Sequence, residues 1–148
     1  MITLKLEGME ELNSQIKKLE SEYGKQLKGA HITAGKLVEG SAKKSIQEKS
    51  PGNMTVRYRN GGNSYEHQSA AKGDAPNTDT GRLVNSVNTE PAPGGAFVGT
   101  TLQYGLYLEI GDHPWLIPAL QSRKGDIASV YISAINKSID EVAKSAKL

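Results

Sequence analysis

The sequence contains no cysteine, one tryptophan, one phenylalanine and no long hydrophobic run. Without cysteine, disulfides and thiolate zinc sites are excluded, which fits synthesis in a reducing cytoplasm. No stretch approaches the ~20 apolar residues of a membrane-spanning helix, and the N-terminus lacks the apolar run of a signal peptide. Hydrophobic residues make up only 36% of the 148 residues. We therefore expect one soluble domain with a small core and no membrane partner.

A strong excess of charge is also missing. The 18 basic and 16 acidic side chains leave a net charge of +2. A protein that neutralises several phosphates usually carries a basic face or stripe, so this balance argues against a specific nucleic-acid partner. The G-x-S-x-G turn of serine hydrolases and the G-x-x-x-x-G-K-[ST] phosphate loop are absent too. We expect no enzyme activity, no catalytic residue and no cofactor.

The three histidines offer little metal-binding chemistry. His31 falls in a predicted helix without a ligand partner at helical spacing, and His67 follows Glu66 in a polar segment. His113 lies four residues after Glu109, and a small metal-dependent enzyme that uses these two side chains stays open as an alternative. Two ligands do not make a metal site, however, so we predict no bound metal.

Hydrophobic spacing predicts a strand and two helices before residue 50. Ile2, Leu4 and Leu6 alternate with polar residues, as in a strand. Gly24 is a typical helix stop, which separates a first amphipathic helix from a second helix at residues 25–48. The apolar positions of the first helix, spaced by three and four, are Met9, Leu12, Ile16, Leu19 and Tyr23.

One face of the second helix consists of small residues. Each interior glycine costs about 1 kcal/mol relative to alanine, so their number requires a reason. Close approach to a sheet or to another subunit's backbone is one explanation, and a kinked or irregular helix is the other. The small residues are Gly29, Ala30, Ala34, Gly35, Gly40, Ser41 and Ala42.

Residues 53–79 form a long polar segment that offers few side chains to a core. Residues 55–59 have strand composition, residues 60–63 predict a turn, and residues 64–68 can return as the partner strand. A loop of this length in a compact domain is usually functional or disordered. We name residues 53–79 the arm, and expect the arm to be mobile in the isolated protein and ordered on contact with a neighbour.

The arm carries a small basic and aromatic cluster, formed by Arg57, Tyr58, Arg59 and Tyr65 with Lys72 nearby. Such residues can bind single-stranded nucleic acid by base stacking and phosphate pairing. They can equally pack across the two strands of a hairpin. We favour packing because the net charge is low, and a small nucleic-acid-binding module remains the alternative function.

The segment at residues 72–87 combines a turn with the start of a helix. Pro76 favours an extended backbone at the residue before it. Asp79 and Thr80 each carry an oxygen that can cap a helix beginning at Gly81. Because no side chain here is an obvious nucleophile or general base, we interpret the motif as architectural.

The last third of the chain predicts a hairpin and two helices. Residues 84–90 and 96–101 have strand composition and are joined by a loop at residues 91–95. Residues 104–110 predict a short helix. A long closing helix has its apolar positions at Ile127, Val130, Tyr131, Ala134, Ile135, Ile139, Val142 and Ala146.

Trp115 lies between Pro114 and Pro118. Burying this tryptophan would remove on the order of 200 Å² from water, roughly 4–6 kcal/mol. We predict a core anchor, and a rigid segment presented to a partner subunit is the alternative.

Three segments in order along the chain resemble one known family. They contain D-T-G-R-L-V-N-S, V-G-T followed by Y-G-L-Y-L-E-I-G, and P-W-L-I-P-A-L. The sequence thereby resembles the tail-completion, or head–tail joining, family of long-tailed double-stranded DNA bacteriophages, whose members are also described as minor tail components. The chain has His113 where the family usually has arginine, and a shorter link from Gly111 to Pro114. The residues of this interaction motif are Pro76, Asp79, Thr80, Gly81, Leu83, Gly99, Tyr104, Tyr107, Glu109, Gly111, Pro114, Trp115 and Pro118.

The resemblance implies an α+β fold, with a small antiparallel sheet packed against two or three helices and the arm extending from them. It also implies a non-catalytic phage or prophage protein at the head–tail junction of the virion, assembled in the cytoplasm of the bacterial host. Its partners would be further copies in a ring, hexameric in the particle, together with the tail-tube protein and the head connector or stopper. A ring closes through head-to-tail interfaces, and the arm would supply part of that contact.

Overall fold

A computed structural model describes residues 8–146, in which helices and short antiparallel strand pairs form an α+β fold. The predicted fold class is therefore confirmed. The strand predicted at Ile2, Leu4 and Leu6 lies outside the described residues. Among residues 8–146, no helix has the length and hydrophobicity to cross a membrane. In chain order the elements are α1 (Met9–Gln47), β1 (Met54–Tyr58), β2 (Ser64–Gln68), α2 (Arg82–Ser86), β3 (Asn88–Ala92), β4 (Gly95–Gly99), α3 (Gln103–Ile110), α4 (Leu116–Ser122) and α5 (Lys124–Ala146).

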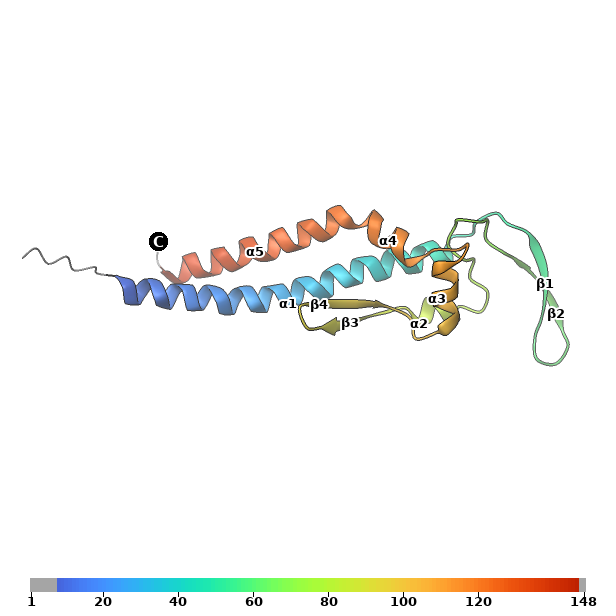
Figure 1. Cartoon of the computed structure of the whole chain (residues 1–148), viewed down its shortest axis with the longest axis horizontal. Coiled ribbons are helices and arrows are strands. Elements are labelled where there is room, and N and C mark those ends of the chain that lie inside the picture. The colour runs from blue at the N-terminus through green and yellow to red at the C-terminus, as the bar shows by residue number, and fades with distance from the viewer. Residues whose placement is uncertain (1–7, 147–148) are drawn as a thin grey trace, which may run out of the picture.

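The helices α1 and α5 lie side by side and run in opposite directions along the molecule (Figure 1). His31 Nδ1 and the Tyr131 hydroxyl form a hydrogen bond of 2.7 Å across this pair. The predicted helix end at Gly24 is wrong, because α1 continues unbroken through it. One interior glycine costs about 1 kcal/mol, and the packing of the flanking apolar positions against α5 outweighs that cost.

The β3–β4 hairpin packs against α1 at a position where α1 has no side chain. A Cβ atom built on Gly35 would overlap Thr89 Cγ2 and would lie 3.3 Å from Ala96 Cβ and 3.4 Å from Val98 Cγ2. Of the two explanations for the small residues of α1, close approach to a sheet is therefore correct at Gly35.

We expect Gly35→Ala to lower the free energy of unfolding by about 1–2 kcal/mol, because overcrowding outweighs the gain in helix propensity. Thr89 cannot turn aside freely, since its hydroxyl is bound to Glu39. The matched control is Gly40→Ala in the same helix, where nothing lies within 4 Å of an added Cβ. The free energy of unfolding of this control should rise by about 0.5–1 kcal/mol, because alanine favours the helix more than glycine does. Urea unfolding of both variants measures the two effects, and equal signs would contradict the close contact at Gly35.

The buried carboxylate of Glu39 ties the hairpin to α1. It accepts hydrogen bonds from Lys36 Nζ at 2.6 Å, from Lys43 Nζ at 2.7 Å and from the Thr89 hydroxyl at 2.7 Å. Burial raises the pKa of Glu39, but these three hydrogen bonds outweigh burial and lower the pKa from 4.5 to about 2. Glu39 is therefore ionised in the folded protein at neutral pH.

This shift predicts a pH dependence of stability. Because the folded-state pKa is depressed, the contribution of Glu39 is fully present above pH 4.5 and is lost as the pH falls toward 2. We expect the ionised Glu39 to contribute about 1–2 kcal/mol to the free energy of unfolding. The contribution is limited because the two lysines remain in contact with solvent, which screens their charges. Urea unfolding of Glu39→Gln should differ from wild type at pH 6 and converge with it near pH 2. Glu48→Gln is the control, because the Glu48–Lys44 pair is exposed.

The core lies where the C-terminal half of α1 meets α2 and α4. The strand predicted at residues 84–90 is wrong in its first half, because α2 is helical and β3 begins only at Asn88. The predicted loop at residues 91–95 is also too long, since only Pro93 and Gly94 lie between the paired strands. The buried core residues are Val38, Ala42, Ile46, Leu83, Val84, Val87, Trp115 and Ala119.

The long closing helix predicted from the apolar positions at residues 127–146 is confirmed as α5. A short helix that the sequence did not predict, α4, precedes α5 and meets it at Arg123. Pro118 lies in the first turn of α4, where the missing N–H has no helical acceptor to lose. α4 packs on the end of α1, and α5 then turns back along α1 (Figure 1). The predicted short helix at residues 104–110 is confirmed as α3.

Candidate interaction surface

Asp79, in the segment before α2, holds the β1–β2 hairpin of the arm in place. β1 and β2 pair antiparallel, with Arg57 opposite Tyr65 and Thr55 opposite His67, so these four side chains share one face of the hairpin. The Asp79 carboxylate accepts hydrogen bonds from Arg57 Nη1 at 2.7 Å and from the Tyr65 hydroxyl at 2.9 Å. His67 Nδ1 lies 3.8 Å from Asp79 Oδ1. We name this cluster the Asp79 clasp, and it unites residues that the sequence placed in two separate motifs.

The helix-capping roles predicted for Asp79 and Thr80 are wrong. The N-cap residue of α2 is Gly81, whose φ of 75° is left-handed, and no side chain caps this helix. Asp79 binds the β1–β2 hairpin instead, while Thr80 is exposed. The helix start itself was predicted correctly to within one residue.

The charges of the clasp favour the arrangement seen. Burial raises the pKa of Asp79, but hydrogen bonds from Tyr65 and Arg57 outweigh burial and lower it below the usual value. The hydrogen bond to Asp79 raises the pKa of the Tyr65 hydroxyl. The Arg59 guanidinium lies 4.8 Å from the centre of the Tyr65 ring, within cation–π range. Arg57 and Arg59 thus both contact other side chains of the arm at the protein surface, whereas Tyr58 is 76% exposed and is not part of the clasp.

We expect Asp79→Asn to loosen the arm without unfolding the body. Loss of one charge-assisted contact, taken at the low end because Arg57 is half exposed, corresponds to about 1.4 kcal/mol. Amide hydrogen exchange in β1 and β2 should therefore accelerate about tenfold, while exchange in α1 stays unchanged. Glu66→Gln, on the other face of the same hairpin, is the control. Unchanged exchange in the hairpin of Asp79→Asn would contradict the clasp.

The return segment of the arm is fastened to the end of α1 by Asn77. Its Oδ1 accepts a hydrogen bond from the Ser50 amide at 2.7 Å, and its Nδ2 donates to the carbonyl oxygens of Ser50 at 2.8 Å and Gln68 at 3.0 Å. The Thr78 amide donates to the Ile46 carbonyl at 3.1 Å. Residues 53–79 are therefore two parts: a protruding hairpin and a segment bound to the body.

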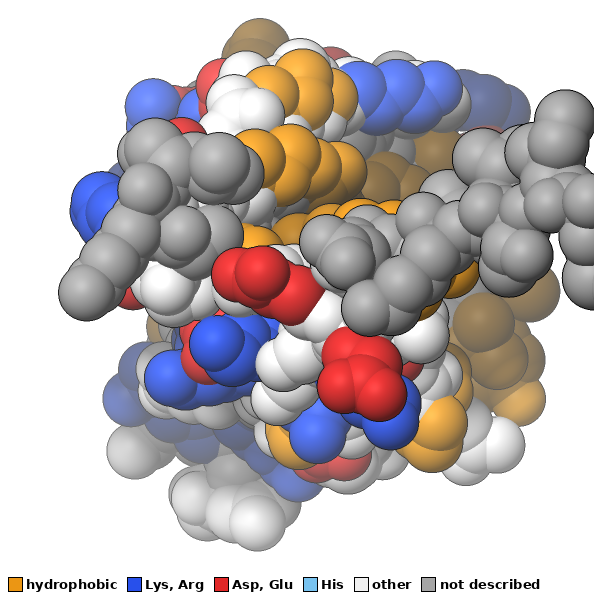
Figure 2. Space-filling model, turned by 90° about the vertical axis from the view of Figure 1, so that its left-hand side faces the viewer, with side chains coloured by type: hydrophobic (Ala, Val, Ile, Leu, Met, Phe, Trp, Pro, Cys, Tyr) orange, Lys and Arg blue, Asp and Glu red, His pale blue; other side chains and the backbone are white. Residues whose placement is uncertain are grey.

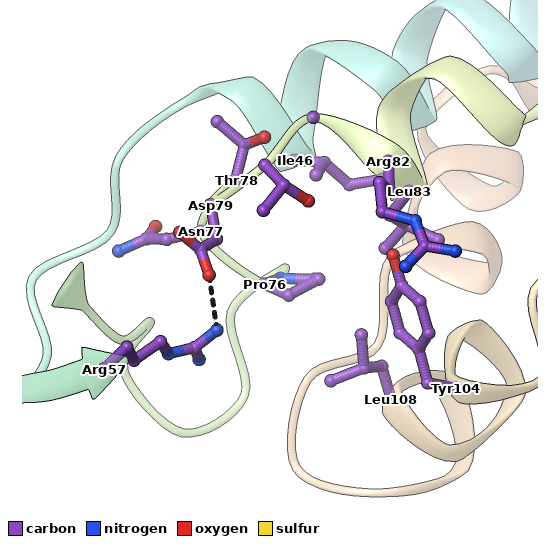
Figure 3. A pocket seen from close by; sticks show the side chains of 12 residues that line it. Ile46, Arg57, Pro76, Asn77, Thr78, Asp79, Arg82, Leu83, Tyr104 and Leu108 are labelled. Carbon is purple, nitrogen blue, oxygen red and sulfur yellow. Dashed lines mark hydrogen bonds and ion pairs between the residues drawn. The ribbon is translucent and has the colours of Figure 1, made fainter. Parts of the chain in front are cut away.

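A pocket of about 400 Å³ opens beside the clasp, between the end of α1, the segment before α2, and α3. Figure 3 shows the Arg57–Asp79 pair on one side of this pocket and Tyr104 on the other, with Ile46 and Leu108 among the apolar side chains between them. An apolar interior with a few polar groups at its edge is typical of sites that take an apolar side chain or small ligand.

Glu109 caps α4 across the loop at residues 111–115. Its carboxylate accepts hydrogen bonds from the backbone amides of Trp115 and Leu116, both at 2.7 Å, and of Ile117 at 2.8 Å. The metal-binding alternative for Glu109 and His113 is not supported, because the carboxylate is occupied by these amides. Within residues 8–146, no group of three acidic or histidine side chains could hold a metal ion.

Trp115 is only 2% exposed, which confirms the predicted core anchor. Its Nε1 donates a hydrogen bond to the Gly105 carbonyl at 3.0 Å. An added Cβ at Gly105 would lie 2.5 Å from Thr100 Cγ2 and 3.1 Å from Leu83 Cδ1, so α3 can approach the core only with glycine there. The ring therefore sits under α3 and is not presented to a partner.

The remaining residues of the predicted interaction motif hold local positions. Gly99 ends β4, Gly111 follows α3, and Pro114 precedes the buried tryptophan. Tyr107 is exposed on α3, and Pro76 lines the pocket. Sequence patterns missed Asn77, whose three bonds join segments far apart in sequence, and they missed Glu39. Neither residue belongs to a spacing pattern that would have identified it.

Comparison of the chain with protein-family models, with curated proteins and with solved structures found no match. The resemblance of the three sequence segments to the tail-completion family thus stays a prediction.

Proposed function

We propose that this protein is a structural component of a long-tailed phage or prophage, placed at the head-proximal end of the tail. There, copies of the chain would form a ring that joins the tail tube to the head connector, without catalysis. The observation that carries the proposal is that the three segments resembling the family contact one another. The Ser86 and Thr100 hydroxyls form a hydrogen bond of 2.6 Å between the first and second segments, and Glu109 binds the amide of Trp115 in the third.

The motif residues support a non-catalytic role by what they do. Leu83 and Trp115 share the core, and Glu109 caps a helix. These side chains stabilise the protein's own fold, as expected for a motif with a structural role. Large apolar side chains remain exposed on α1, α3, α5 and the arm, and such surfaces are typical of proteins that bind other proteins.

The nucleic-acid-binding alternative would need the cations of the arm. Arg57 is paired with Asp79 and Arg59 lies over Tyr65, so binding would have to displace existing contacts. Filter binding to single-stranded DNA at several salt concentrations distinguishes the two proposals, because phosphate contacts give a steep salt dependence. Tight, salt-sensitive binding would favour the alternative.

The direct experiment is deletion of the gene from the phage or prophage that carries it. We expect full heads and complete tails to accumulate unjoined, and wild-type protein supplied in trans to restore infectious particles. The variant Glu48→Gln, at an exposed ion pair on neither strand of the arm, should restore them equally. Firmly joined, infectious particles formed without the protein would overturn the proposal.

A further inference from the structure

The arm hairpin has a second face that the Asp79 clasp does not use. Met54, Val56 and Tyr58 alternate along β1 and therefore point to the face opposite Arg57. Their side chains are 59%, 59% and 76% exposed. We name these three residues the arm face. One face of the hairpin is thus held by the clasp, while the other presents the three apolar side chains of β1 to solvent, beside Ser64, Glu66 and Gln68 of β2.

A second apolar surface lies on the part of the helix pair that is farthest from the arm. We name it the helix seam, and it consists of residues that are between 37% and 52% exposed. Figure 2 views the molecule from this end and shows hydrophobic side chains gathered between the two helices. A hollow of about 300 Å³ lies within the seam, against Tyr23 and Ile139. The seam residues are Leu12, Ile16, Leu19, Tyr23, Ile135 and Ile139.

Chemistry separates the seam from the rest of the helix pair. Another groove between α1 and α5 is lined largely by charged side chains, including Lys18, Glu22 and Lys137. A partner that buries apolar side chains is therefore directed to the seam, because removing charged groups from water against apolar side chains is costly. Among the described residues, no segment of the chain covers either the seam or the arm face.

We propose that the arm face of one copy docks onto the helix seam of a second copy, in a head-to-tail contact. The two surfaces lie at opposite ends of the molecule (Figure 1). The seam begins 24 residues before the end of α1, which at 1.5 Å per residue places it ~36 Å or more from the arm's attachment. A five-residue hairpin reaches only ~17 Å, so the arm cannot cover the seam of its own chain.

The sizes of the two surfaces agree with contact between copies. A half-exposed large apolar side chain leaves roughly 100 Å² accessible, so the nine side chains of the arm face and the seam together offer about 900 Å². With the polar residues around them the contact approaches the ~1,200 Å² at which specific interfaces begin. Since the two surfaces differ, the contact is heterologous and can close into a ring. The use of this contact in a phage ring rests on the proposed function, whereas the contact itself rests on the two surfaces.

The test is sedimentation velocity of the full purified chain over roughly micromolar to millimolar concentrations, the range expected for an interface of this size. We expect wild type to self-associate. Tyr58→Asp on the arm face and Ile139→Asp on the seam should each weaken association at least tenfold. Ile110→Asp, at a 72% exposed position on neither surface, should associate as wild type does. Circular dichroism checks that each variant is folded, and Leu12→Glu replaces Ile139→Asp if that variant is not.

Mixing Tyr58→Asp with Ile139→Asp tests whether the contact is head-to-tail. Each variant keeps one intact surface, so an equimolar mixture should form a discrete heterodimer that grows no further. A seam that pairs with another seam would instead leave Tyr58→Asp fully associated, and that result would overturn the proposal. So would a wild-type chain that stays monomeric throughout. If such a monomer associates only after removal of residues 1–7, the seam's occupant is the chain's own N-terminal segment. Each of these results concerns purified protein, so it leaves the gene-deletion experiment an independent test of the proposed function.

Discussion

Replacement of Trp115 by alanine is expected to lower the free energy of unfolding by about 4 kcal/mol. The substitution removes a side chain that is 2% exposed and leaves a cavity between α1, α3 and α4. It also removes the donor that satisfies the Gly105 carbonyl. Because single domains are stable by only about 5–15 kcal/mol, a loss of this size threatens the folded state. Urea unfolding followed by circular dichroism measures the change.

Two variants separate the causes of that loss. Trp115→Phe keeps much of the ring contact but not the indole N–H, and should cost about 1–2 kcal/mol. Tyr107→Ala removes an aromatic side chain that is 60% exposed on α3 and should cost less than about 0.5 kcal/mol. If Trp115→Ala cost no more than Tyr107→Ala, Trp115 would not be the anchor of this core.

Local patterns predicted those parts of the fold that depend on neighbours in sequence. The strand pair of the arm follows from residues 55–59 and 64–68 around an Asn-Gly turn, and both strands form in register. The apolar positions spaced by three and four at residues 127–146 predicted the long helix α5. Trp115 was predicted to be buried because its area is large, which requires no knowledge of its partners.

The errors arise where distant contacts decide the structure. Gly24 ends a helix in many contexts, but here α5 packs beside α1 and the helix continues. Val84 and Val87 look like strand residues because they are β-branched, yet both are buried by the core around α2. Asp79 has the side chain of a cap, but Arg57, 22 residues earlier, binds it instead. A single sequence does not reveal such pairs.

The candidate site is explained least by sequence, because it is assembled from four separate segments. Pro76 and Asp79 were identified as part of a motif, and Arg57 as part of the arm. Their meeting at one pocket depends on the end of α1 at Ile46 and on α3 at Leu108. The clasp orients the hairpin by one face and so leaves the apolar face outward. The contacts that hold the arm in place therefore also determine which surface it offers to a partner.

Loss of the Glu109 carboxylate is the other large effect that we expect. Its three hydrogen bonds satisfy the first amides of α4, which have no acceptor within the helix. A carboxylate at a helix N-terminus also interacts favourably with the helix dipole. Glu109→Ala should therefore lower the free energy of unfolding by about 2–3 kcal/mol. The loss is not larger because Ile117 is exposed, so that its freed amide can bond to water instead.

Glu109→Gln tests how much of this effect is due to charge. The amide of glutamine keeps one accepting oxygen but replaces the other with a donor that faces backbone N–H groups, so we expect about half the loss. Amide hydrogen exchange should report the damage locally, with Trp115 to Ile117 exchanging faster while β1 and β2 remain unchanged. Glu66→Gln, an exposed carboxylate on the arm, should alter neither stability nor exchange in α4. If Glu109→Ala and Glu66→Gln behaved alike, the connection between α3 and α4 would not depend on this cap, and the contact between the second and third motif segments would lose its physical basis.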